Sequence, residues 1–122
     1  MRIIELMQST FESESGDIAL YLAMSKKAAD EGHSDIASYL YDIAMDEARH
    51  AAEFAMLLGK VKDTRTNLKM MIEDEIKAVK EKAEGAKIAH ELGNEEVFEF
   101  FDRALHDETR HKEVLSKIME KY

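Results

Sequence analysis

The chain has no cysteine and no proline, and only five glycines occur among its 122 residues. Without cysteine, the sequence excludes disulfides, thiolate zinc sites, iron–sulfur clusters and cysteine nucleophiles. β-Sandwiches and barrels need many tight turns, which usually contain glycine or proline, so the scarcity of both favours a few long helices. At this length we expect a single domain spanning residues 1–122.

The chain also lacks a surplus of positive charge and a long apolar segment. Its 17 Lys and Arg residues stand against 26 Asp and Glu residues, a net charge of −9. We therefore expect no nucleic-acid partner, because no excess of basic residues can neutralise phosphates. The longest apolar runs, near 18–24 and 54–58, are too short to cross a membrane. The N-terminal sequence Met1–Glu5 does not read as a signal peptide, so we expect a cytoplasmic protein without membrane association.

Apolar residues recur at spacings of three and four throughout the chain, which predicts helices. Four helices are expected, at about residues 3–30, 35–58, 64–92 and 95–121. Ser34 is the expected N-cap of the second helix, and Asp63 or Thr64 that of the third. Every connection is short, which favours an all-α four-helix bundle.

The second half of the chain repeats the first at an offset of 61 residues. The segment Asp46–His50, with sequence DEARH, matches Asp107–His111, with sequence DETRH, and Glu14 matches Glu75. The sequence therefore predicts two copies of one helical hairpin, related by a pseudo-twofold axis. The two hairpins are expected at about residues 3–59 and 63–121.

A pattern of glutamates and histidines recurs within this repeat. Glu47 and His50 are three residues apart and share a helix face, as do Glu108 and His111. A single Glu-x-x-His pair is common by chance, but two pairs at equivalent places in a repeat are far more specific. Counted from the turns at Gly32 and Gly93, Glu14 lies within about 5 Å of the level of Glu47. The same count places Glu75 at the level of Glu108.

Four carboxylates and two imidazoles in one buried layer would be intolerable without cations, so we expect two divalent metal ions. Hard oxygen ligands with one imidazole per metal suit iron or manganese better than a structural zinc site, although zinc could also bind. The predicted ligands are Glu14, Glu47, His50, Glu75, Glu108 and His111.

This pattern resembles the rubrerythrins, members of the ferritin-like di-iron carboxylate superfamily. The resemblance covers nearly the whole chain, and in both halves 33 residues separate the single glutamate from its Glu-x-x-His motif. Its most specific parts are Glu14-Ser15, Asp46-Glu47-x-Arg49-His50, Glu75 and Asp107-Glu108-x-Arg110-His111. It implies a ferritin-like bundle with two iron ions.

The resemblance also implies roles for individual residues. Glu47 and Glu108 would bridge or flank both metals, Glu14 and Glu75 would be terminal ligands, and each histidine would bind one metal. Tyr21, two turns after Glu14, resembles a family tyrosine that hydrogen-bonds a ligand carboxylate. The aspartates of the two DExRH motifs would orient the opposing imidazoles and pair with the neighbouring arginines. These aspartates are Asp46 and Asp107, and the arginines are Arg49 and Arg110.

The sequence departs from the family pattern in two ways. Peroxide-reducing rubrerythrins usually carry an extra glutamate three residues after the third-helix ligand, where this chain has Ala78. Its repeat equivalent is Asp17, which could be an additional ligand or a solvated acid. The absence of cysteine also means that no rubredoxin-like domain is expected, so electrons would come from a separate protein such as a rubredoxin.

The resemblance implies an oxidoreductase that reduces hydrogen peroxide or dioxygen in oxidative-stress defence. One alternative is a ferritin-like ferroxidase or iron-binding protein, and another is a non-enzymatic metal-binding bundle. Tyr21 is then the catalytic candidate, or else an ordinary core aromatic. The lysines of the third helix, interleaved with acids, predict an exposed face laced with salt bridges. They are Lys77, Lys80, Lys82 and Lys87.

The connection near 59–62 is too short for the long crossover that ferritin-like bundles place between their second and third helices. Two arrangements would resolve this conflict. One is an up-down-up-down bundle within a single chain. The other, which we favour, is a domain-swapped homodimer, in which the first hairpin of one chain packs on the second hairpin of its mate.

Overall fold

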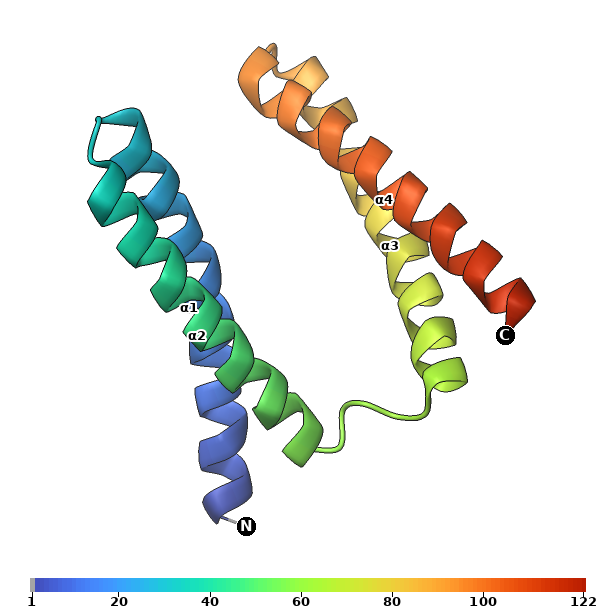
Figure 1. Cartoon of the computed structure of the whole chain (residues 1–122). Coiled ribbons are helices and arrows are strands. Elements are labelled where there is room, and N and C mark those ends of the chain that lie inside the picture. Colours follow the sequence, from blue (N-terminus) through green and yellow to red (C-terminus); the bar gives the residue numbers. More distant parts are fainter. Residues whose placement is uncertain (1) are drawn as a thin grey trace. The chain divides into compact units, whose positions relative to one another are not determined.

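The computed structural model describes residues 2–122, so Met1, which the predicted domain includes, lies outside the described residues. Within residues 2–122 the chain forms no strand, and its helices confirm the predicted all-α class (Figure 1). None of these helices is long and apolar enough to cross a bilayer. The helices are α1 (Arg2–Asp30), α2 (Ser34–Leu57), α3 (Thr64–Glu91) and α4 (Glu95–Lys121).

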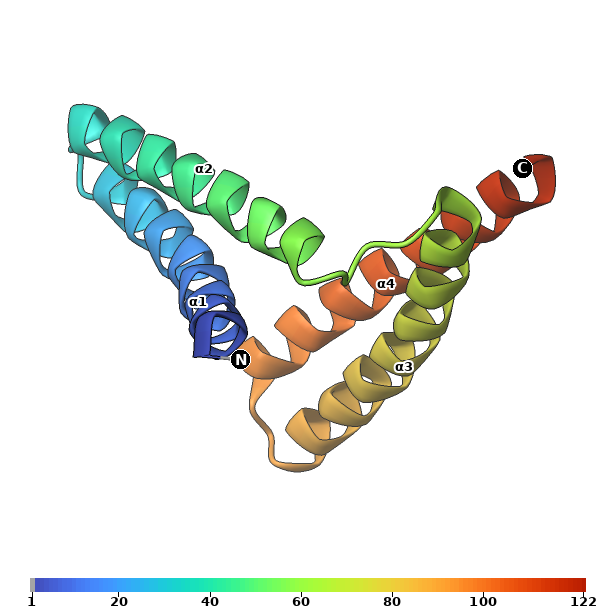
Figure 2. The same ribbon diagram turned by 90° about the horizontal axis from the view of Figure 1, so that it is seen from below.

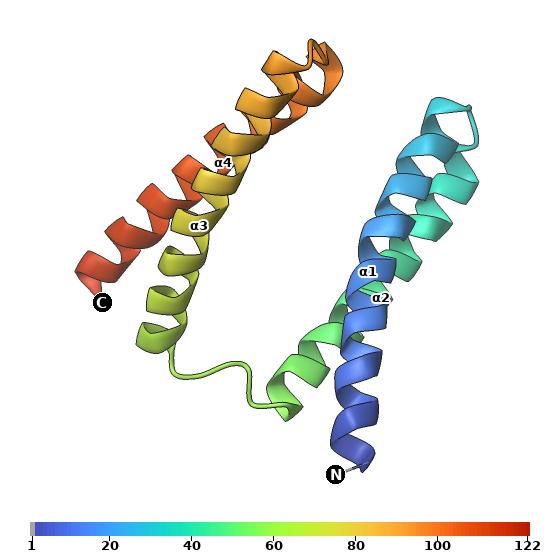
Figure 3. The same ribbon diagram turned by 180° about the vertical axis from the view of Figure 1, so that it is seen from behind.

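The helices pack in consecutive pairs. We call α1 with α2 hairpin 1, and α3 with α4 hairpin 2. In hairpin 1 the two helices lie side by side (Figure 2), and in hairpin 2 they do so as well (Figure 3). The two repeated hairpins that the sequence predicts are therefore present.

The same turn closes both hairpins. Gly32 and Gly93 adopt φ angles of +83° and +69°, in the left-handed region that glycine enters without steric cost. The following amide, of His33 or Asn94, donates a hydrogen bond back to the carbonyl of Ala28 (2.8 Å) or its repeat equivalent in α3 (2.9 Å). Because both turns end and restart the helices in the same way, equivalent residues face each other at the same level in both hairpins.

The helix caps partly follow the sequence prediction. Ser34 is not an N-cap, because α2 begins at this residue and its cap is His33, which makes no side-chain capping bond. The carbonyl of His33 already accepts the amide of Ala37 at 2.9 Å, so the helix starts one residue early. Asp63 does cap α3, since its Oδ2 accepts the amide of Thr66 at 3.3 Å.

The interface inside each hairpin is built from small side chains. The buried residues of α2 are Ala37, Ala44 and Ala51, which are seven apart and form one stripe. Ser25 on α1 donates its hydroxyl to the Ala37 carbonyl at 2.7 Å, which ties the two helices at this stripe. Small residues let the helices approach closely, but no large side chain among residues 2–122 is fully buried. Large apolar residues such as Tyr39 remain exposed, so neither hairpin encloses a core of its own.

The cap at Asp63 predicts a pH-dependent start of α3. The Thr66 hydroxyl donates to the Asp63 carboxylate at 2.6 Å and holds the pKa of Asp63 below its ordinary value. A lowered pKa stabilises the fold above the ordinary pKa, and this stabilisation is lost as the pH falls through the lowered value. We expect Asp63→Ala to lower the thermal midpoint at neutral pH, with a difference that shrinks by about pH 3, measured by circular dichroism.

Asp63→Asn is the matched control, because asparagine keeps a capping oxygen without a charge, as Asn94 does for the amide of Val97 at 3.1 Å. It should retain more of the stability at neutral pH than the alanine variant. If Asp63→Ala lowered the thermal midpoint by the same amount at neutral pH and at about pH 3, the proposed role of the carboxylate charge would be contradicted.

Candidate metal centre

Hairpin 1 brings together three of the predicted ligands. Glu47 follows the wholly buried Ala44 by three residues, which places its carboxylate beside the α1–α2 interface. Across that interface, Glu14 reaches the same point from α1. The His50 Nδ1 atom lies 3.4 Å from Glu14 Oε1 and 3.8 Å from Glu47 Oε1. These residues form cluster 1, in which one potential ligand atom per residue lies within 4.8 Å of the other two.

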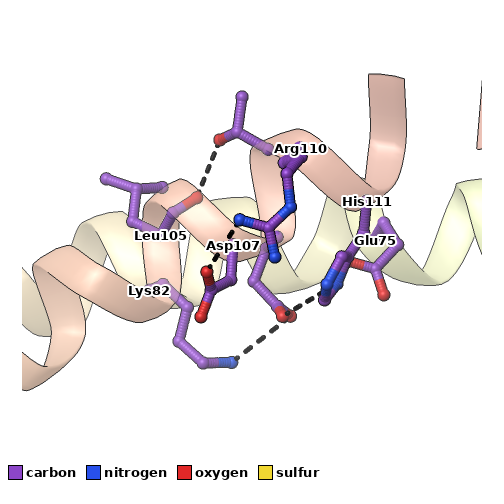
Figure 4. Close-up of polar contacts among 8 residues, drawn as sticks. Glu75, Lys82, Leu105, Asp107, Arg110 and His111 are labelled. Carbon is purple, nitrogen blue, oxygen red and sulfur yellow. Dashed lines mark hydrogen bonds and ion pairs between the residues drawn. The ribbon is translucent and has the colours of Figure 1, made fainter. Parts of the chain in front are cut away.

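Hairpin 2 builds the equivalent cluster from the repeated residues (Figure 4). The His111 Nδ1 atom lies 3.4 Å from Glu75 Oε2 and 3.6 Å from Glu108 Oε1. The same 4.8 Å limit encloses one potential ligand atom from each residue. We call this group cluster 2. The structure thus brings all six predicted ligands into two groups of the same composition; that they bind metal stays a prediction.

The carboxylates in both clusters are largely removed from solvent. The side chains of the four glutamates are between 15% and 21% exposed, whereas His50 is 56% and His111 46% exposed. Within residues 2–122, the buried Oε2 atoms of Glu14 and Glu75 accept no hydrogen bond. A buried oxygen without a hydrogen bond costs free energy that a bound cation would recover.

The donor sets of the two clusters fit the predicted metals. Each cluster offers carboxylate oxygens and one imidazole nitrogen, a combination that suits iron or manganese. Two carboxylates carry the charge that one divalent ion neutralises. Three protein ligands fill fewer positions than such ions take, so each ion would keep sites open for a bridging ligand or a substrate.

The aspartates of the DExRH motifs pair with the arginines, as the resemblance implies. Asp46 Oδ1 accepts a hydrogen bond from Arg49 Nη2, and Asp107 Oδ1 lies 3.2 Å from Arg110 Nη1. These pairs connect residues three apart on α2 and α4. The implied hydrogen bonds from the aspartates to the imidazoles of the opposing hairpin stay predictions.

Two other residues named from the sequence are not tied to the clusters. Tyr21 is half-buried, and its hydroxyl makes no hydrogen bond within residues 2–122, so its catalytic role stays a prediction. Asp17 is half-buried too, but it does not belong to cluster 1. Its repeat equivalent Ala78 offers no ligand atom.

One residue beside cluster 2 has an environment that the sequence did not suggest. Lys82 was expected on an exposed salt-bridged face, but its side chain is only 25% exposed and its Nζ lies 3.8 Å from Glu108 Oε2 (Figure 4). The expectation was wrong for this lysine because it lies two turns after Glu75, on the α3 face that meets α4. The repeat could have indicated this environment, because Lys82 occupies the position equivalent to Tyr21, two turns after the single glutamate.

A sequence profile of the rubrerythrin family matches residues 5–119. The chain belongs to the rubrerythrin family. It is 41% identical over 117 residues to an uncharacterized protein of Methanocaldococcus jannaschii, with 95% of this chain and 83% of that relative covered. It is 34% identical over 122 residues to reverse rubrerythrin-1 of Clostridium acetobutylicum, with 98% of this chain and 67% of that relative covered. The resemblance to the ferritin-like di-iron rubrerythrins is thereby confirmed.

The buried carboxylates predict that metal stabilises this rubrerythrin through both clusters. A saturating concentration of Mn²⁺ should raise the unfolding midpoint of metal-free protein by about 5 °C or more. Glu14→Ala and Glu75→Ala should each lose a large part of that rise, because each removes a ligand. The measurement is thermal unfolding by circular dichroism, with and without Mn²⁺.

Matched controls exist two residues before each ligand. Glu12 and Glu73 are exposed acids at equivalent repeat positions on α1 and α3. Glu12→Ala and Glu73→Ala should leave the Mn²⁺-dependent rise intact. A rise that is the same in the ligand variants as in these controls would rule out metal binding at the clusters.

Proposed function

We propose that this member of the rubrerythrin family is a di-iron oxidoreductase that reduces hydrogen peroxide, or dioxygen, in oxidative-stress defence. The observation that carries the proposal is the pair of equivalent Glu₂His clusters, each holding a buried carboxylate oxygen without a hydrogen bond. Two such clusters joined in one centre would hold a pair of metal ions. Peroxide reduction by such a pair requires no protein nucleophile.

The overall reaction balances with two electrons. One hydrogen peroxide takes up two electrons and two protons and yields two water molecules. Two iron ions held by the residues of the two clusters would supply these two electrons, one from each ferrous ion. The electrons that restore the ferrous state are proposed to come from another protein, such as a rubredoxin, because these 122 residues contain no cysteine to hold an iron–sulfur site.

The chain supports this reaction through charge and proton supply. The four cluster carboxylates offset the charge of two divalent ions, and each imidazole binds without adding charge. The half-buried Tyr21 hydroxyl, two turns from Glu14, is proposed to hold a proton near cluster 1. The arginine pairs of Asp46 and Asp107 are proposed to keep these carboxylates in place beside the ligands.

We expect anaerobically loaded ferrous protein to consume one hydrogen peroxide for every two ferrous ions oxidised. The absorption change on oxidation measures this stoichiometry and its rate. Tyr21→Phe should slow the reaction without changing the iron content, while Glu108→Ala should lose both iron and reaction. Glu12→Ala is the control that should retain both.

Two results would overturn the proposal in favour of the alternatives. Uptake of many iron ions per centre during oxidation by dioxygen would indicate a ferroxidase with iron storage. The absence of bound iron, with stability unchanged in Glu47→Ala and Glu108→Ala, would indicate a bundle without a metal function.

We further propose that the complete centre is assembled from two chains. Six residues, 58–63, join α2 to α3 and span at most about 25 Å when extended. A ferritin-like bundle sets its second and third helices parallel, so the connection must return along α2, a distance of about 36 Å. The chain cannot close this bundle by itself. Hairpin 1 of one chain would pack on hairpin 2 of a second copy.

The direction of the Glu-x-x-His motifs favours this arrangement. His50 and His111 each lie about 4.5 Å further along the helix than the glutamate of the same motif. In the proposed assembly α2 and α4 would be antiparallel, and the two imidazoles would lie on opposite sides of the glutamates, so that each could hold one ion. An up-down-up-down bundle in one chain makes α2 and α4 parallel and crowds both imidazoles on one side.

Mixed dimers test the proposed assembly. One chain carries Glu47→Ala with His50→Ala, the other carries Glu108→Ala with His111→Ala, and different affinity tags allow purification of the mixed species. A swapped dimer regains one intact centre, because the intact hairpins of the two chains meet. Loaded with Mn²⁺, it should show the electron paramagnetic resonance signal of a coupled ion pair, which each variant alone should lack.

The wild-type chain, which should show the coupled pair and the mass of a dimer, provides the reference. No coupled pair in the mixed species, together with a monomeric wild-type chain that shows one, would establish the single-chain bundle instead.

A further inference from the structure

The two clusters are nearly identical in their ligands but not in their surroundings. The distances from imidazole to carboxylate differ by 0.2 Å at most between cluster 1 and cluster 2. Cluster 2 has a lysine of its own hairpin, Lys82, paired with one of its carboxylates, whereas no lysine of the described part of hairpin 1 pairs with a carboxylate of cluster 1. The contact that makes this difference lies within hairpin 2 itself.

Lys82 is directed at a ligand rather than at solvent. Its Nζ lies 3.8 Å from Oε2 of Glu108, while Oε1 of the same carboxylate lies 3.6 Å from His111 Nδ1 (Figure 4). Its side chain is 25% exposed, whereas Lys26, in an ion pair with Asp30 on the surface of α1, is 80% exposed. A partly buried ion pair is screened less by salt and water than a surface pair.

The repeat shows what the lysine replaces. At the equivalent position in hairpin 1 stands Tyr21, which is neutral. Cluster 1 therefore presents two carboxylates to a metal ion without an adjacent lysine, and cluster 2 presents two carboxylates with one positive charge already beside them. A divalent ion entering cluster 2 is repelled by the ammonium group and competes with it for Glu108.

We propose that Lys82 is a positioning residue that makes the two metal positions unequal. Its ammonium group holds Glu108 in the metal-free protein and weakens metal binding at cluster 2, so that cluster 1 fills first. This inference rests on the proposed function, because it requires both clusters to bind metal. With Lys82 in this role, the two metal ions would bind in a fixed order, and the ion at cluster 2 would be held less tightly than the ion at cluster 1.

A titration of metal-free protein with Mn²⁺ tests the proposal, with free Mn²⁺ followed by electron paramagnetic resonance. Wild-type protein should bind in two steps, and Glu14→Ala should remove the tighter step while Glu75→Ala removes the weaker one. Lys82→Met, which keeps the length of the side chain and removes its charge, should strengthen the weaker step by about tenfold or more.

Three further variants separate charge from structure. Lys82→Arg keeps the charge and should keep the weak step. Tyr21→Lys places the charge beside cluster 1 and should weaken the tighter step. Lys80→Met removes an exposed lysine from the same helix and should change neither step.

A weaker step that is unchanged in Lys82→Met, or strengthened equally by Lys82→Arg, would overturn the role of Lys82 while leaving the metal centre in place. No Mn²⁺ binding in wild-type protein, or binding that neither Glu14→Ala nor Glu75→Ala affects, would overturn the metal centre and the role of Lys82 together. The two failures are therefore distinguishable.

Discussion

The constraint on which this structure depends is the charge of two carboxylates held at a two-helix interface. In hairpin 1 the alanine stripe of α2 lets α1 approach closely enough for Glu14 to meet Glu47 and His50. The same approach removes carboxylate oxygens from water and leaves one of them without a hydrogen bond. In hairpin 1, neither packing nor a lysine or arginine of the described residues offsets this charge, and in both hairpins a divalent cation would offset it.

On the proposed function, each hairpin would be half of the metal centre as well as half of the bundle. Its interior is formed by alanines, while large apolar side chains such as Tyr39 and Phe100 remain exposed on its helices. Burying these side chains and completing the proposed metal centre would both require a second hairpin. The six-residue connection between α2 and α3 limits which hairpin can serve, because a chain segment of that length cannot return along a helix. Folding and assembly of the centre are in this view one process.

Duplication explains the similarity of the two halves, and divergence explains how they differ. The two hairpins share the same predicted ligands and the same turn, at Gly32 and Gly93. A different residue at a ligand position would remove a predicted ligand, and a different turn would change how the two helices of the hairpin pair. The repeat position that Tyr21 and Lys82 occupy can accept different residue types, because it is neither a predicted ligand nor part of a turn. A change from a neutral to a positive side chain at such a position alters the field at one metal position and leaves the framework intact.

Much of the fold and of the candidate site could be predicted from the sequence. Helical periodicity and the missing turn residues predicted the all-α class, and the offset of 61 predicted two hairpins. The spacing of Glu-x-x-His, with levels counted from the turns, selected the residues that the structure brings together in each cluster. These features depend on local geometry, because a helix fixes which residues share a face and how far apart they lie.

Other features depended on contacts that residue types and their spacing do not show. Ser34 was predicted as an N-cap, but a hydrogen bond across the turn, from the His33 amide to the Ala28 carbonyl, accompanies a helix that begins one residue earlier. The charge pattern of α3 placed Lys82 among exposed lysines, because a pattern along one helix does not show what the next helix presents to it. The sequence by itself determined the helices, the repeat and the residues that meet in each cluster. Only the tertiary structure decided that Lys82 meets Glu108, since the packing of α3 against α4 sets that contact.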